Sequence, residues 1–149
     1  MMKVVSLLGG LGFVSAMVQG PLVFTRSVRD GIYTSGQAGR GKAQYTEFCA
    51  GCHMPDLAGR VDPAATSRNP GSSAPALRGG VFVAKWTGMS VGDLFDRIRI
   101  SMPQERPGAL SRRQNADILA FILQENGYAS GADELPTTGS VLTPIRFEP

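Results

Sequence analysis

The pentapeptide Cys49-Ala50-Gly51-Cys52-His53 is the stretch that decides the fold. On a helix, thiols three residues apart face the same side, one turn from each other. Such a pair followed directly by histidine is typical of covalent haem attachment. Each sulfur can form a thioether with one vinyl group of the same porphyrin, and the imidazole can bind the iron. The sequence therefore predicts one haem c held by Cys49, Cys52 and His53.

Three other interpretations of these residues account for the sequence less well than haem attachment does. A structural disulfide between the two cysteines leaves His53 unexplained. A dithiol redox site belongs near a βαβ pattern, and the sequence shows none. A structural zinc site takes about four ligands. The chain has two cysteines and one histidine, so carboxylates would have to complete that set.

Size and composition fit a small domain built around a cofactor. The 149 residues suit one domain with appendages. With 42% hydrophobic and 7% aromatic residues, the core is modest, and a large cofactor would fill much of it. The 19 glycines and 10 prolines predict long loops. A net charge of +3 is too small to indicate nucleic-acid or strong membrane-surface binding.

The first 24 residues are typical of an export signal. Lys3 precedes an apolar run, Val4–Val18, and small residues at 14–16 suit cleavage. The alternative is an uncleaved anchor, because Val4–Phe24 could span a bilayer of ~30 Å, although Gln19–Pro21 interrupt it. Either way the remainder is predicted to be periplasmic or extracytoplasmic. A membrane is a partner only if this segment is retained.

Residues 25–33 read as a linker, and a helix follows. Thr34 is a candidate N-cap with Gln37 as its capping-box partner, and the helix is predicted to run to about Cys52. Gly41 and Tyr45 lie on the same face of this helix as Phe48 and Cys49. A glycine there costs ~1 kcal/mol against alanine. We therefore expect a close helix crossing at Gly41; the alternative is a glycine tolerated in a helix stabilised elsewhere.

The stretch 57–80 has no helical or strand period and should be loop. A ligating histidine usually gives its second N–H to a carbonyl. Pro75 is our candidate for that carbonyl, with Leu77 packing on the ring; the alternative is an ordinary loop proline. Farther along, the indole N–H of Trp86 can bind a haem propionate or simply pack in the core.

Met102 is the candidate for the second axial ligand. A helix opened by Ser90 carries an apolar stripe and must end before Pro103, which places Met102 at the start of a loop. Of the other candidate thioethers, Met54 adjoins the histidine and cannot reach the opposite face, and Met89 precedes a helix cap. The alternative for all three is core packing, the commoner use of methionine.

A third helix is predicted from a Ser111–Gln114 capping box to Asn126, ending at Gly127. Its apolar face carries Ile118 and Phe121, which can pack against the first helix. The tail, residues 129–149, should be irregular. Its apolar residues are candidates to cover the domain: Leu142, Ile145 and Phe147.

Together, residues 34–127 resemble the class I c-type cytochromes, and we assign 34–128 to a cytochrome c domain. The resemblance implies an all-α fold of about three to five helices around one covalently attached haem c, with the first and last helices crossing. It implies that His53 and Met102 are axial ligands and that Pro75 supplies the carbonyl. It also implies that Gly41 and Tyr45 meet Ile118 and Phe121. One departure is Met54, where many members have glycine.

A narrower resemblance points to cytochromes associated with quinoprotein alcohol dehydrogenases. The residues that carry it are Met102-Pro103, Pro107-Gly108, Leu110-Ser111, Asp117-Ile118, Asn126-Gly127 and Glu134-Leu135. It implies a dehydrogenase of the quinoprotein kind as electron donor, and a terminal oxidase or another cytochrome as acceptor.

The expected function is that of a periplasmic one-electron carrier, an electron-transfer protein rather than an enzyme. Two axial ligands would leave no open position on the iron. The alternatives are a five-coordinate haem enzyme or ligand sensor, and a permanent haem subunit of a dehydrogenase complex. A group of arginines is a candidate docking rim or an ordinary solvated face: Arg99, Arg106, Arg112 and Arg113.

Overall fold

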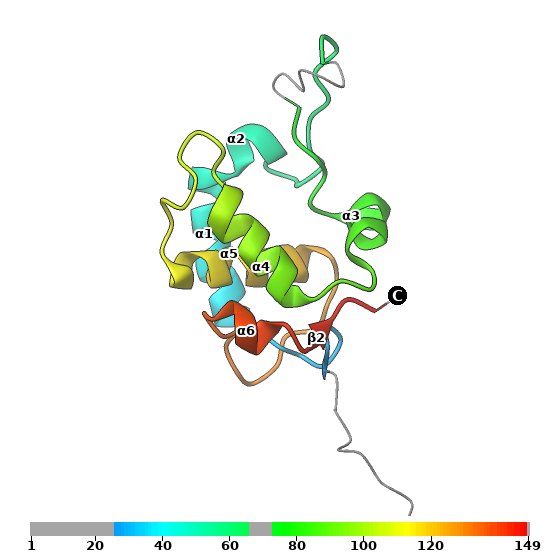
Figure 1. Cartoon of the computed structure of the whole chain (residues 1–149), viewed down its shortest axis with the longest axis vertical. Coiled ribbons are helices and arrows are strands. Elements are labelled where there is room, and N and C mark those ends of the chain that lie inside the picture. The colour runs from blue at the N-terminus through cyan, green and yellow to red at the C-terminus, as the bar shows by residue number, and fades with distance from the viewer. Residues whose placement is uncertain (1–25, 66–72, 149) are drawn as a thin grey trace, which may run out of the picture.

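The computed structural model describes residues 26–65 and 73–148, and this part of the chain is almost entirely helical (Figure 1). In chain order its elements are β1 (Arg26–Ser27), α1 (Ser35–Phe48), α2 (Ala50–His53), α3 (Gly79–Trp86), α4 (Val91–Ser101), α5 (Arg112–Glu125), α6 (Gly139–Leu142) and β2 (Ile145–Arg146). The predicted all-α class is confirmed. The described residues hold six helices rather than three to five, because α2 and α6 are separate pieces of four residues each.

Local capping signals start the long helices where the sequence predicts. Full capping boxes form at Ser90 with Asp93 and at Ser111 with Gln114. The box expected at α1 is only half formed. The Thr34 hydroxyl accepts from the Gln37 backbone N–H at 3.1 Å. The Gln37 side chain instead exchanges two hydrogen bonds with the backbone of Leu135 in the tail.

The crossing of α1 and α5 is as close as the sequence predicts. A Cβ at Gly41 would overlap the backbone carbonyl of Asp117. One turn along, the rings of Tyr45 and Phe121 lie 5.3 Å apart, centroid to centroid. Gly41 therefore allows the two backbones to touch, and the alternative of a merely tolerated glycine is wrong.

An ion-pair network holds the same crossing. The guanidinium of Arg40 on α1 donates to both carboxylate oxygens of Asp117, at 3.0 and 3.1 Å. It also donates to Glu134 in the tail at 2.7 Å. The Asp117 side chain is only 1% exposed, so removal of Arg40 would leave a buried charge without this partner.

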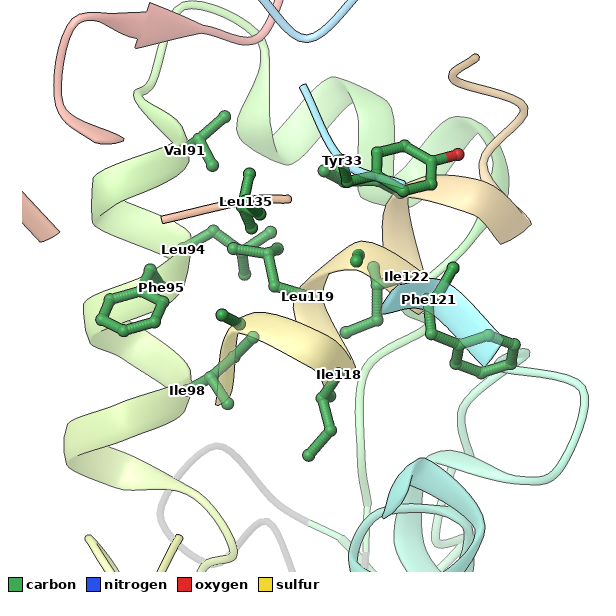
Figure 2. Close-up of a cluster of buried hydrophobic side chains, with 14 of the residues drawn as sticks. Tyr33, Val91, Leu94, Phe95, Ile98, Ile118, Leu119, Phe121, Ile122 and Leu135 are labelled. Carbon is green, nitrogen blue, oxygen red and sulfur yellow. The ribbon is translucent and has the colours of Figure 1, made fainter. Parts of the chain in front are cut away.

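The core is built around α5. Residues 115–123 of α5 are all buried, which means that helices or loops cover it on every side. In Figure 2, side chains of α4 and α5 face each other, with Leu94 beside Leu119. Ile98 and Ile118 belong to this cluster and also line the cavity described below, so the core is continuous with the site.

The two ends of the described chain differ from the linker and irregular tail that we predict. β1 pairs with β2 as a parallel ribbon, with Arg26 opposite Ile145 and Ser27 opposite Arg146. In the linker, Val28, Ile32 and Tyr33 are buried. In the tail, the candidate covering residues are buried as expected: Leu142, Ile145 and Phe147. A strand of two residues is too short to show an alternating pattern in the sequence. Its partner strand also lies more than a hundred residues away.

The end of the tail packs against α3 and the turn that follows it. Phe147 exchanges backbone hydrogen bonds with the turn after α3, accepting from Gly88 N–H and donating to the Met89 carbonyl. Its ring lies 6.2 Å from that of Trp86 and 6.1 Å from that of Phe82. The tail thus packs behind Trp86 and holds α3 in place.

Within residues 26–65 and 73–148, no helix is both long and apolar enough to cross a membrane. The predicted signal or anchor, residues 1–24, lies outside the described residues.

Candidate haem site

All seven residues that the sequence analysis proposes for haem binding line one cavity of about 460 Å³. They are Cys49, Cys52, His53, Pro75, Leu77, Trp86 and Met102. Helices α1 to α5 all contribute residues to its lining, together with the loops before α3 and after α4. Residues that are up to 53 positions apart in sequence therefore meet at one site.

The Cys49–His53 segment is a single turn that begins where α1 breaks. The predicted helix to Cys52 ends instead at Phe48, and α2 then starts from Cys49 with its own hydrogen bond, His53 N–H to the Cys49 carbonyl at 2.9 Å. Both thiols are half-buried, and they are not joined in a disulfide. Burial raises the pKa of the Cys49 thiol to about 11, so it is neutral at pH 7 before attachment.

No set of three or more histidine, cysteine or carboxylate side chains gathers as a metal site within the described ranges. The described residues thus do not assemble the ligand set that a structural zinc site at Cys49 and Cys52 would need.

His53 is oriented by a backbone carbonyl. The side chain is buried, and Nδ1 lies 2.8 Å from the carbonyl oxygen of Pro75. Because a carbonyl only accepts, Nδ1 must carry the proton in this hydrogen bond. The lone pair of the neutral imidazole is then on Nε2, the nitrogen available to bind a metal.

The loop that carries Pro75 is held by its own backbone pairing, which the sequence did not reveal. Arg60 and Ala74 exchange two backbone hydrogen bonds of 2.8 Å each, and Leu77 N–H donates to the Leu57 carbonyl. Gly59 lies inside this turn with φ +75°, and a Cβ there would be 2.5–2.6 Å from backbone atoms of residues 74–76. Only glycine permits this approach, and the approach brings Pro75 over His53.

Met102 is the C-cap of α4 and lines the cavity together with Pro103. Among the described residues that line the cavity, Met102 is the only methionine. Met54 is held away from the cavity with φ +67°, and its carbonyl accepts from Tyr45 OH at 2.8 Å. Met89 is 39% exposed and lines a neighbouring surface groove instead.

The remaining walls have the chemistry that a haem requires. Apolar side chains from three helices form one part of the lining: Phe48, Leu94, Ile98, Ile118 and Ile122. Three cations form another, Arg60, Lys85 and Arg97, and suit the two carboxylates of a haem. The sequence did not single out these cations, because basic residues at helical and loop positions usually read as solvated surface. Trp86 is 6% exposed, with the Lys85 ammonium 5.9 Å from its ring centroid.

The family model for cytochrome c matches residues 38–125, which is more than half of the chain. The chain belongs to the cytochrome c family. A cytochrome c binds covalently attached haem c with iron, and the thiols, imidazole, apolar walls and cations of this cavity fit that group. Cys49 and Cys52 are the only two cysteines of this cytochrome c, so they are the thiols available for attachment.

Comparison with solved structures returns the sulfane dehydrogenase SoxCD from Paracoccus pantotrophus. It is 22% identical to this cytochrome c, with a TM-score of 0.42, and the match covers 93% of this chain and 68% of that chain. No curated protein matches the sequence of this cytochrome c.

Proposed function

We propose that this cytochrome c is a periplasmic one-electron carrier whose iron is bound by His53 and Met102. Membership of the family establishes haem-based electron transfer. The observation that carries the proposed ligands is that an oriented imidazole and a thioether line the same cavity, from α2 and from the end of α4.

The haem, when bound, supplies one-electron chemistry between ferric and ferrous iron. The residues of the chain tune that chemistry. Pro75 holds the Nδ1 proton of His53, which raises the basicity of the imidazole. A thioether ligand from Met102 favours the reduced state and raises the potential. Ile98, Ile118 and their apolar neighbours exclude water from the cavity. With both axial positions filled, substrate chemistry at the metal is not expected.

The periplasmic location rests on the sequence. Lys3 and the apolar run Val4–Val18 are typical of export. An oxidising compartment would tend to convert a free cysteine pair to a disulfide, and thioether formation at both sulfurs prevents this. Whether residues 1–24 are cleaved or retained as an anchor decides whether the carrier is free or membrane-bound.

The proposed partners are a dehydrogenase that donates electrons and an oxidase or second cytochrome that accepts them. The narrower resemblance at Met102-Pro103 and Pro107-Gly108 favours a quinoprotein donor. If the protein is instead a permanent haem subunit, it co-purifies with the dehydrogenase through gel filtration. A free shuttle separates from it.

The visible absorption spectrum of the purified protein tests the ligand assignment. A His/Met carrier is expected to be low-spin in both oxidation states, with the long-wavelength ferric band of a methionine–iron bond. It should not change when cyanide or carbon monoxide is added at low concentration. A high-spin ferric spectrum that responds to these ligands would contradict the carrier and indicate a five-coordinate haem enzyme or sensor.

A further inference from the structure

One carboxylate lies against the haem attachment point. Glu105, in the loop between α4 and α5, lines the cavity, and its Oε1 atom is 3.9 Å from Sγ of Cys52. Among the described residues that line the cavity, it is the only carboxylate. The loop runs beside α2 in Figure 1, across the molecule from α3, which carries the cation Lys85. The carboxylate thus lies at the thioether side of the site.

We propose that Glu105 lowers the reduction potential of the bound haem by holding this charge beside Cys52. The inference rests on the proposed electron-carrier function. Reduction adds an electron to the haem, and a fixed negative charge nearby opposes that addition. Once Cys52 has formed its thioether it has no S–H to donate, so the carboxylate acts through its charge and not through a hydrogen bond. Glu105 acts on the haem only through its electrostatic field and does not contact the iron.

The surroundings set how strong the effect is. Glu105 is exposed, so water weakens its field, and dissolved ions screen it further. The carboxylate oxygen nevertheless lies only 3.9 Å from the sulfur, which keeps the charge close to the attachment point. The influence on the potential should therefore be largest at low ionic strength.

The test is a redox titration of the full, haem-loaded protein and its Glu105→Gln variant in low-salt buffer at pH 7. The amide keeps the size of the side chain and removes its charge, so the variant is expected to have a higher potential. Glu105→Lys should raise it further. The difference between wild type and Glu105→Gln should shrink as salt is added, which a purely structural change would not produce.

Asp133→Asn is the matched control, because Asp133 is an exposed carboxylate that does not line the cavity. It should leave the potential unchanged. The inference is overturned if Glu105→Gln has the potential of the wild type, if Asp133→Asn shifts it equally, or if the shift does not depend on salt. It is also overturned if Glu105→Gln changes the spectrum of the iron, since the shift would then come from altered ligation. A wild-type spectrum without methionine ligation would contradict the proposed ligands, not this effect.

Discussion

Replacing Met102 with alanine is expected to lower the reduction potential while the haem stays attached. Axial ligation moves haem potentials over a range of ~0.8 V, so loss of the thioether should lower this one by on the order of 0.1 V or more. Attachment through Cys49 and Cys52 and the imidazole of His53 are untouched by the change. The measurement is a redox titration together with the ferric absorption spectrum, in which the methionine–iron band should disappear.

Met89→Ala is the control, because Met89 lies in a neighbouring groove and not in the cavity. It should keep the band and the potential. If Met102→Ala keeps both and Met89→Ala loses them, the ligand has been assigned to the wrong methionine. If neither variant differs from the wild type, the iron has no methionine ligand.

Gly41→Ala is expected to destabilise the fold by about 3 kcal/mol or more, at the upper end of the effects of overpacking. The added methyl group would overlap the carbonyl oxygen of Asp117. That carbonyl is part of the backbone of buried helix α5, and it cannot rotate aside as a side chain would. The two helices must separate, which also strains the hydrogen bonds between Arg40 and Asp117. Urea unfolding of the haem-loaded protein, followed by circular dichroism, measures the loss.

Gly39→Ala supplies the matched control on the same helix. Gly39 has no heavy atom within 4 Å of the position of a Cβ. Alanine is the better helix former, so this variant should be more stable than the wild type by about 0.5–1 kcal/mol. Equal effects of the two substitutions would mean that the loss at Gly41 is not caused by the contact with Asp117.

The sequence could indicate the seven residues that turn out to line one cavity because its strongest signals are local. The spacing of Cys49, Cys52 and His53, and the position of Met102 just after an apolar stripe, depend only on neighbours in the chain. Hydroxyl caps such as Ser90 and Ser111 act over three residues, and those caps formed. Gly41 is an exception, because its contact with the distant helix α5 was predicted from the glycine itself and from the apolar face with Ile118 and Phe121.

What the sequence missed depends on contacts between distant segments. The Gln37 amide leaves its expected cap to bind Leu135, 98 positions away. The pairing of Arg26 with Ile145 has no signature in two residues. Glu105 and the cations of the cavity look like ordinary surface charges until the fold places them around one space. Gly59 is one glycine among 19, and its importance shows only in the fold, where a Cβ would be 2.5–2.6 Å from backbone atoms of residues 74–76.

The intact mass of the mature protein, measured after denaturation, tests the central claim most directly. Covalent attachment predicts the mass of the polypeptide plus one haem, with a red colour that acidified acetone does not extract. The sample should be purified from the proposed compartment, the periplasm, so that maturation is complete. A mass equal to that of the amino acids alone, or colour that the solvent removes, would contradict the attachment through Cys49 and Cys52 on which the account depends.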